Sequence, residues 1–344
     1  MYDLIRISEV FSEHHAEILK RLDAAGAKKL GTEYYLLPGP MPASELSLFV
    51  RWQMPIHHSW PCSPEKTEHF LDKACCALEQ KCAAAGVQQV MVSPLISGSP
   101  HPFFKKLATA LRQRLMASLL EKKAKIDPEE QNPQDLTLFC LVGKEGLFAS
   151  IATPRDCGGF YAGGSKYISH NAAHSISRAG AKIAEALHFL RLHHPALSET
   201  THWLELGASP GGMTAELLER GYRVTAVDRA PMDPRISSHP RLSCYAENAA
   251  AFFPPRGERY DALLCDMNGP ARESFAIVAA KLPYLEPGAL IIFTLKTHKT
   301  GSLDEWLELR RQVQQDATRV GLRSIAHTHL TYNRHEFTLI WRKG

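Results

Sequence analysis

The sequence lacks the patterns that mark several common protein classes. Its eight cysteines form no C-x-x-C pair and have no zinc-ligand spacing, so we expect no metal site and a reducing compartment. No apolar run approaches the length of a membrane-spanning helix, and the first residues carry no signal-peptide pattern, which predicts a cytoplasmic protein without a membrane partner. The formal net charge is only +4, so a nucleic-acid surface requires local clusters of cations.

The chain also lacks internal repeats and low-complexity segments, and its length of 344 residues allows two or three domains. Strand and helix signals are mixed in the first part, with a helix expected over 102–120 and a strand over 45–52. They alternate regularly in the second part. The division we expect is an α+β, ferredoxin-like region over 1–86, a second region over 87–157, a linker over 158–175 and an α/β domain over 176–344.

The alternation in the second part favours a doubly wound parallel sheet. Its expected strands cover residues 203–206, 223–227, 262–265 and 289–295, with helices over 176–192, 212–219, 246–252, 272–282 and 303–320. Two final strand signals, at 323–332 and 336–342, are separated by too few residues for a parallel crossover, so they must run antiparallel.

A glycine-rich segment follows the buried run Trp203–Leu206. Gly207–Gly212 has the pattern G-x-S-P-G-G, which differs from the G-x-G-x-x-G of dinucleotide sites, and Pro210 has no N–H to offer a phosphate. The loop therefore favours a ligand with an adenosine and a short charged tail, such as S-adenosylmethionine. The cofactor contacts that we expect are Glu205, Gly207, Ala208, Ser209, Pro210, Gly211, Gly212, Met213, Asp228, Glu247, Asn248 and Asp266.

Three acidic residues have separate expected roles in that site. Asp228 ends the next strand, about 20 residues after the glycines, where a carboxylate hydrogen-bonds a ribose hydroxyl. Glu205 is the candidate partner of the methionine amino group. Glu247 and Asn248 are the candidate partners of the adenine amino group. The alternatives are a helix cap for Asp228, a solvated strand end for Glu205 and a polar turn for Glu247.

Two charged residues follow the next apolar runs. Asp266 comes directly after the run at 262–265, and Lys296 after the run at 289–295. A lysine at the end of a buried strand is costly unless it is paired or functional, and burial beside another cation lowers its pKa toward that of a base. The alternatives are a Lys296 side chain that extends to solvent and an Asp266 that caps a helix.

From about Ile176 to the last residue, the chain resembles the FtsJ-like ribose 2′-O-methyltransferases. The matching segments are Ser177–Lys182 (S-R-A-G-A-K), Leu206–Gly212, Ala230–Pro234, Cys265–Met267, Phe293–Lys296 and Arg334–Phe337. The resemblance implies a class I methyltransferase fold with an antiparallel last strand, S-adenosylmethionine as cofactor, and a catalytic tetrad of Lys182, Asp266, Lys296 and Glu336.

The tetrad implies a division of roles. Lys296, its pKa lowered by burial and by Lys182, accepts the proton of a ribose 2′-hydroxyl or stabilises the alkoxide. Asp266 orients Lys296, and Glu336 holds Lys182 or the ribose.

Within this family, the chain resembles the RlmM type, which methylates a cytidine ribose of 23S rRNA. The similarity of Phe104–Leu115 implies a THUMP-like RNA-binding region over 87–157, although a basic run is also typical of a solvated helix face. The cations expected to contact RNA are Lys105, Lys106, Arg112, Arg114, Arg155 and Lys166, with Tyr161 stacking on the target base.

Other function classes stay open on the sequence alone. The chain could methylate another RNA, a base or a protein, or it could be a non-catalytic RNA-binding assembly factor that keeps the fold. The turn Asp266–Gly269 lacks the N-P-P-aromatic pattern of amino-directed base methylation, and Cys265 lacks the P-C context of cytosine C5 methylation. An NAD-dependent dehydrogenase is disfavoured by the glycine pattern.

Overall fold

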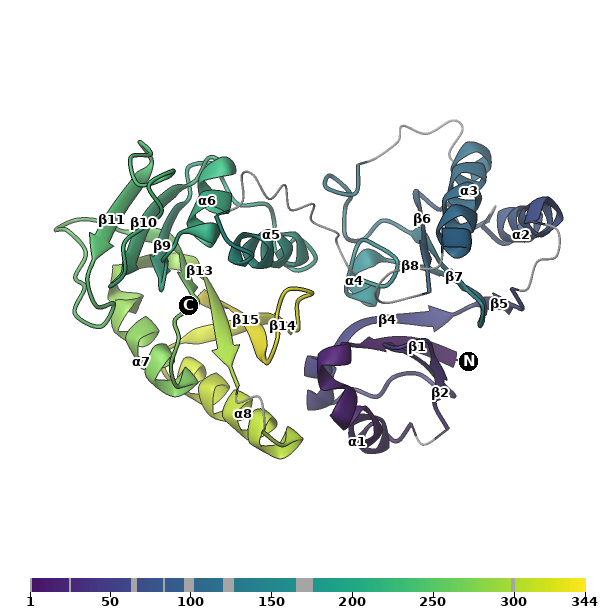
Figure 1. The fold of residues 1–344 in the computed structure, drawn as a ribbon, viewed down its shortest axis with the longest axis horizontal. Helices are drawn as coiled ribbons and strands as arrows, with labels where there is room; N and C mark the ends of the chain where they lie inside the picture. Colours follow the sequence, from purple (N-terminus) through teal and green to yellow (C-terminus); the bar gives the residue numbers. More distant parts are fainter. Residues whose placement is uncertain are drawn as a thin grey trace. The chain divides into compact units, whose positions relative to one another are not determined.

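The computed structural model describes residues 2–24, 26–62, 67–82, 84–95, 102–119, 127–164, 176–297 and 301–344. Internal contacts divide the chain into two compact units, Met1–Lys166 and Tyr167–Gly344, shown in Figure 1. Each unit is described by itself. The finer division predicted at residues 86, 157 and 175 stays a prediction.

The first unit begins with an antiparallel sheet of strand order β2-β3-β1-β4. Its elements are β1 (Tyr2–Ile7), η1 (Glu9–His14), α1 (His15–Arg21), β2 (Lys28–Leu30), β3 (Tyr34–Leu37), η2 (Glu45–Phe49) and β4 (Val50–Ile56). The strand predicted over 45–52 is wrong in its first half. Ser44 Oγ accepts a hydrogen bond from Leu46 N at 3.2 Å, which caps a 3₁₀ turn before the strand begins at Val50.

A second sheet of the same unit has the order β5-β8-β7-β6. Its elements are β5 (His58–Trp60), α2 (Thr67–Cys82), β6 (Gln89–Pro94), α3 (Pro102–Leu119), β7 (Thr137–Gly143), β8 (Gly146–Ala152) and α4 (Pro154–Cys157). The predicted hairpin forms between β7 and β8, and α3 covers almost the whole predicted range. Helices α2 and α3 bury Leu78 and Leu111 in one core with Leu138 of β7.

The segment that follows α4 folds back onto the first sheet. The buried Arg6 guanidinium donates to Gly163 O at 2.6 Å and pairs with Glu33 at 2.6 Å. Gly163 has φ of 84°, and a Cβ there would lie 2.3 Å from Tyr34 Oη, so only glycine fits. Tyr161 packs against the core and donates to Glu129 at 3.2 Å. Residues 158–164 are therefore packed as part of the first unit.

The second unit is built on a seven-stranded sheet of order β11-β10-β9-β12-β13-β15-β14, in which only β15 runs antiparallel to its neighbours. Its strands are β9 (His202–Leu206), β10 (Arg223–Asp228), β11 (Leu242–Ala246), β12 (Tyr260–Cys265), β13 (Leu285–Lys296), β14 (Leu322–Thr328) and β15 (Glu336–Lys343). Its helices are α5 (Ala179–Leu190), α6 (Gly212–Glu219), α7 (Ala271–Lys281), η3 (Leu282–Tyr284) and α8 (Leu303–Arg319). The predicted parallel sheet with an antiparallel last strand is confirmed.

Helices cover both faces of this sheet, as Figure 1 shows. On one side α5 and α6 pack Ile183 and Leu217 against Trp203 and Leu264 of the central strands. On the other side Phe275 of α7 stacks edge-on against Phe293 and Trp341. Among the described ranges, no helix combines the length and hydropathy needed to cross a membrane.

The helix predicted over 246–252 is absent, and this prediction was wrong. The chain forms β11 up to Ala246 and then a turn, because Asn248 Oδ1 accepts from Ala250 N at 3.0 Å. The buried Lys281 ammonium binds Phe252 O at 2.5 Å and holds the end of this turn. The final hairpin is also shorter than expected, since β14 ends at Thr328.

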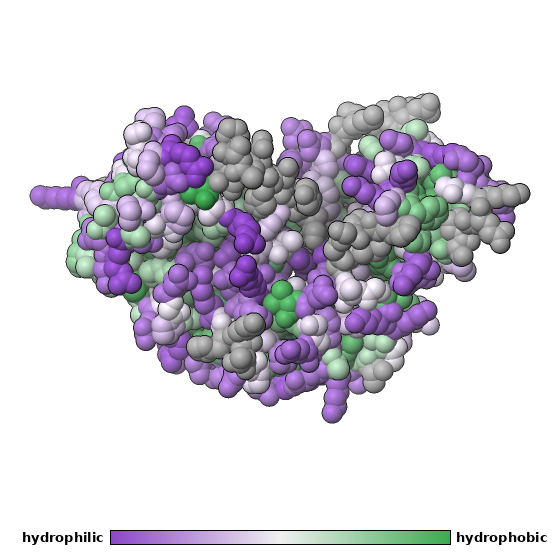
Figure 2. All heavy atoms as spheres, viewed as in Figure 1, coloured by the Kyte–Doolittle hydropathy of each residue, from purple (hydrophilic) through white to green (hydrophobic). Residues whose placement is uncertain are grey.

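Figure 2 shows that the drawn face of the second unit is largely hydrophilic, with small and separate apolar patches. The apolar side chains of its strands lie inside: Trp203, Leu264, Ile292 and Ile340 are all at most 2% exposed. Parallel strands end at the same edge of a sheet, so the loops after β9, β10, β12 and β13 meet there. That edge holds the predicted site.

Candidate active site

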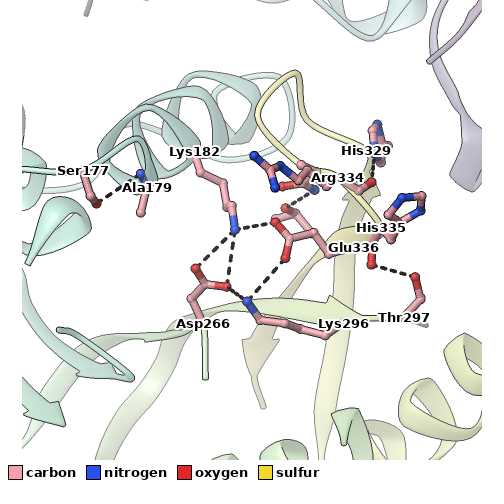
Figure 3. Close-up of polar contacts among 12 residues, drawn as sticks. Ser177, Ala179, Lys182, Asp266, Lys296, Thr297, His329, Arg334, His335 and Glu336 are labelled. Carbon is pink, nitrogen blue, oxygen red and sulfur yellow. Dashed lines mark hydrogen bonds and ion pairs between the residues drawn. The ribbon is translucent and has the colours of Figure 1, made fainter. Parts of the chain in front are cut away.

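Four charged side chains converge at this edge from four elements (Figure 3). Lys182 comes from α5, Asp266 follows β12, Lys296 ends β13 and Glu336 begins β15. The sequence therefore placed all four correctly at strand ends or on the preceding helix. Their separation along the chain is large, yet the fold brings their charged atoms within bonding distance of one another.

The four groups form a closed ring of alternating charge. Lys182 Nζ lies 3.2 Å from Asp266 Oδ2 and 2.5 Å from Glu336 Oε1. Lys296 Nζ lies 3.0 Å from Asp266 Oδ1 and 3.4 Å from Glu336 Oε2. Each carboxylate thus bridges both ammonium groups, and the ring carries no net charge when all four groups are ionised.

Strand register explains half of this ring. Lys296 and Glu336 are opposite one another in the antiparallel pair β13–β15, so their side chains lie on the same face. Asp266 comes directly after Cys265, whose partner on β13 is Phe293, three residues before Lys296. The fourth group, Lys182, comes from α5, which packs over this face. Lys182 is only 8% exposed.

The pKa of Lys296 differs in direction from the sequence expectation. Burial lowers it, but the carboxylates of Asp266 and Glu336 outweigh burial, so the net pKa is raised above its ordinary value. The expected net lowering was wrong because it gave too little weight to the carboxylates of Asp266 and Glu336, which both contact the Lys296 amine. Lys296 is therefore an ammonium at neutral pH.

Two adjoining cavities lie beside the ring. One, of about 160 Å³, is lined by Glu205, Ala208, Ser209, Pro210, Gly212 and Met213, and reaches Asp266 and Lys296. The other, of about 230 Å³, is lined by Glu247 and Asn248. Gly207, Asp228, Met267 and Asn268 line both, so the two cavities form one elongated cleft.

This cleft collects nearly all of the predicted cofactor residues. Gly211 is the exception: a Cβ there would lie 2.5 Å from Ile236 Cδ1, so this glycine lets the start of α6 pack against the chain after β10. Sequence reasoning missed Met267 and Asn268. Their position directly after the Asp266 strand end was the available signal.

Glu205 is almost fully buried at the cleft. Burial raises its pKa to about 8, while a hydrogen bond from Thr214 Oγ1 at 2.7 Å opposes that rise. A buried carboxyl group with one hydroxyl partner favours a cationic ligand. The alternative of a solvated strand end is wrong, because Glu205 is only 2% exposed.

Asp228 shapes the glycine loop as well as facing the cleft. Its Oδ2 accepts from Ser209 N at 3.1 Å and its Oδ1 from Ala230 N at 2.9 Å. Gly207 at the centre has φ of 82°, and a Cβ would lie 2.9 Å from Met267 Cα. The residues present thus fit a nucleoside with a cationic tail: acids at both cavities and a backbone that approaches closely.

Of the cations on α3 that were predicted to contact RNA, two are exposed and two bind protein groups. Lys105 and Lys106 are exposed. Arg114 instead pairs with Glu68 and Asp72 of α2, and Arg112 Nε donates to Val90 O at 3.4 Å. Arg155 is exposed on α4, whereas Lys166 lies outside the described residues.

Comparison with known proteins finds a family match in the second unit. Residues 175–291 match the family of FtsJ-like methyltransferases. The chain is 27% identical to the ribosomal RNA large subunit methyltransferase M of Actinobacillus succinogenes, over 70% of this chain and 66% of that one. It is 33% identical to the enzyme of the same name from Pasteurella multocida, over 47% and 46% of the two chains.

The match spans between about half and two thirds of the length of these relatives. Among solved structures, the fibrillarin/Nop5p complex is similar at 16% identity and a TM-score of 0.41, over 52% of this chain and 92% of that one. The segment 175–291 is similar to FtsJ-like methyltransferases and lies in a unit of class I α/β fold, which supports S-adenosylmethionine as its cofactor.

Proposed function

We propose that this protein is a ribose 2′-O-methyltransferase of large-subunit ribosomal RNA, with 23S rRNA as its substrate. The observation that carries the proposal is the ring of Lys182, Asp266, Lys296 and Glu336 at the mouth of the cleft. A ribose hydroxyl is a very weak acid, so its methylation needs a base and a means of stabilising the alkoxide. The amines of Lys182 and Lys296, held in place by two carboxylates, supply both.

The cleft residues divide the work of holding the cofactor. S-adenosylmethionine, when bound, supplies a methyl group activated by a positively charged sulfur. Asp228 would hold the ribose hydroxyls, Glu205 the amino group of the methionine part, and Asn248 the adenine. Gly207 lines both cavities and has no side chain, so the backbone there would allow a ligand to approach closely.

The ring residues handle the proton of the acceptor. The proton of the 2′-hydroxyl passes to neutral Lys296 Nζ, which becomes an ammonium. Asp266 and Glu336 hold that ammonium at 3.0 and 3.4 Å, and Lys182 keeps both carboxylates in place at 3.2 and 2.5 Å. The raised pKa of Lys296 makes it a strong acceptor once its own proton has left.

Unpaired cations at the mouth of the cleft support a polyanionic substrate. Arg178 precedes Lys182 by one helical turn, and Arg334 lies on the loop just before Glu336 (Figure 3). Both are exposed, and within the described part of the chain neither forms an ion pair with a carboxylate. Other arginines of this unit do, such as Arg223 with Glu258. We assign Arg178 and Arg334 to phosphates that flank the target nucleotide.

The first unit supplies the remaining RNA surface in this proposal. Residues 87–157 correspond to the THUMP-like region, where Lys105 and Lys106 of α3 are exposed cations. The relatives are named for large-subunit ribosomal RNA, which supports that substrate. All eight cysteines are free thiols, which supports a reducing, cytoplasmic location.

The test is methylation of 23S rRNA, isolated from a strain that lacks the gene, by purified protein with labelled S-adenosylmethionine. Mass mapping of nucleosides should find the label on one ribose 2′-oxygen. The Lys296→Ala variant serves as the inactive control, and Arg323→Gln, an exposed arginine of β14, as the active one. Label on a base or on protein would overturn the ribose assignment. Absence of both cofactor binding and label would favour a non-catalytic assembly factor.

A further inference from the structure

A buried carboxylate outside the catalytic ring joins the helix that carries Lys182 to the loop that leads into Glu336. Glu185 lies on α5, three residues after Lys182, and is only 5% exposed. Its Oε1 accepts from Thr331 Oγ1 at 2.5 Å and its Oε2 from Thr331 N at 2.7 Å. Thr331 belongs to the loop between β14 and β15, five residues before Glu336.

This contact uses both oxygens of the carboxylate on one residue. Two hydrogen bonds from the same residue fix its orientation as well as its distance, which a single bond does not. Burial strengthens both hydrogen bonds, because water competes poorly for a carboxylate that is only 5% exposed. The contact therefore sets the position of the loop relative to α5.

Further hydrogen bonds hold the other end of the loop. The imidazole Nε2 of His329 lies 2.8 Å from Arg334 O, and Asn333 Nδ2 donates to Thr338 Oγ1 at 3.2 Å. His335 O accepts from Thr297 N at 3.0 Å, next to Lys296. The first of these bonds lies within the loop, and the other two join the loop to β15 and to the residue after β13, whereas the Glu185–Thr331 contact joins it to the helix.

Glu185 does not line either cavity of the cofactor cleft. The ring depends on the placement of α5 against β15, because Lys182 Nζ and Glu336 Oε1 are only 2.5 Å apart. A shift of the loop by one ångström would lengthen this contact and change how Glu336 is shared between the two amines.

We propose that Glu185 is a positioning residue that, through Thr331, holds Glu336 at the distance the catalytic ring requires. This inference rests on the proposed ribose methylation. A role in folding alone would affect stability, cofactor binding and turnover together. A positioning role affects turnover and the protonation of Lys296 while leaving the cofactor cleft intact.

The experiment compares Glu185→Gln, Thr331→Val and Thr331→Ser in the full-length protein. Glu185→Gln replaces one acceptor oxygen with a donor, and Thr331→Val removes the hydroxyl donor, whereas Thr331→Ser keeps both donors. We expect kcat for 23S rRNA to fall at least tenfold in Glu185→Gln and less in Thr331→Val. The KM for RNA and the Kd for S-adenosylmethionine should stay within about twofold. Thr331→Ser should retain wild-type kcat.

A second readout does not depend on turnover. The carboxylate of Glu336 helps to raise the pKa of Lys296, so displacing Glu336 should lower that pKa. NMR titration of the labelled lysine side chain measures it directly in wild type and Glu185→Gln. Asp261→Asn is the control for loss of a carboxylate that accepts a backbone bond, because the exposed Asp261 accepts from His202 N at 2.9 Å at the opposite end of the sheet.

The outcomes separate the two proposals. Wild-type protein that fails to methylate ribose overturns the proposed function, whatever the variants do. An unchanged kcat and an unchanged Lys296 titration in Glu185→Gln overturn the positioning role alone. So does a parallel loss of kcat, cofactor affinity and thermal stability without a change in the Lys296 titration, because that pattern describes a purely structural residue.

Discussion

Lys296 and Glu336 face each other across the antiparallel strands β13 and β15, and their charged atoms lie 3.4 Å apart. The single antiparallel strand of the sheet is therefore what brings a carboxylate to the end of β13. A parallel strand in that place would begin at the opposite edge of the sheet, with its first residue far from Lys296. The catalytic ring depends on this reversal of strand direction.

Removal of the Lys296 amine should strongly slow methyl transfer. We expect Lys296→Ala to lower kcat by about 10²- to 10⁴-fold, the usual contribution of a positioned base, with cofactor affinity within a few-fold of wild type. Single-turnover assays and calorimetry measure the two quantities. Retained turnover would remove Lys296 from the role of base.

The pH dependence of activity follows from the raised pKa of Lys296. Only the neutral amine accepts a proton, so kcat should rise with pH through the neutral range without a plateau. Asp266→Asn removes one of the two carboxylates that raise this pKa, so the rising limb should move to lower pH even though the variant is slower. A profile that falls with pH would contradict this assignment.

Cofactor binding should release a proton through Glu205. Its pKa is about 8 in the folded protein, against an ordinary value of 4.5. Between pH 4.5 and pH 8, the folded state therefore holds a proton that the unfolded state has lost. The free energy of unfolding should fall as pH rises through that window. An arriving ammonium group favours the ionised form. Calorimetry at pH 7 in buffers of different ionisation enthalpy should detect the released proton.

Glu205→Gln is the variant that checks this assignment. It should abolish the proton release and weaken cofactor binding at least tenfold, because a neutral amide replaces the partner of a cation. It should also flatten the dependence of stability on pH between 5 and 8. Proton release that persists in Glu205→Gln would assign the titration to another group.

Gly207→Ala should damage the cofactor cleft more than the backbone strain alone explains. A Cβ at residue 207 would meet Met267 Cα at 2.9 Å, and φ is 82°. Gly257 has nearly the same φ, 85°, with no atom within 4 Å of a Cβ, so Gly257→Ala is a matched control. Both variants should lose about 1–2 kcal/mol of stability from the positive φ. Only Gly207→Ala should lose S-adenosylmethionine affinity, and equal affinities in the two would contradict a steric role for residue 207.

RNA binding should depend on Lys105 and Lys106 and be independent of Arg114. The double variant Lys105→Ala/Lys106→Ala removes two exposed cations, so the slope of log K against log salt should fall by about 1–2. Arg114→Gln removes a cation whose charge is already paired with Glu68 and Asp72, and it should leave that slope unchanged. Filter binding at several salt concentrations gives both slopes.

Local sequence patterns predicted the elements of the second unit well. The short run from Trp203 to the glycines, apolar except for Glu205, and the longer apolar run before Lys296 both form buried strands. The two predicted elements that failed have local causes. The Asn248 side chain bonds its own backbone and replaces a helix by a turn, and the Ser44 side chain caps a 3₁₀ turn where a strand was expected.

The charged sites show the limit of sequence reasoning more clearly. The four ring residues could be picked out as strand ends and motif matches, but the direction of the Lys296 pKa required the contact distances to both carboxylates. The pairing of Arg114 with Glu68 joins residues 46 positions apart. The Glu185–Thr331 contact joins residues 146 positions apart, and no local pattern signals it.

The ring is unevenly open to water. The Lys296 side chain is 25% exposed, whereas those of Lys182, Asp266 and Glu336 are between 11% and 14% exposed. In the proposed reaction, each catalytic cycle leaves one proton on Lys296, and this is the corner that touches bulk solvent. Lys296 can therefore lose this proton to water before the next cycle, while the amine of Lys182 stays buried. Lys296 is thus both the base of the site and the group through which the proton leaves it.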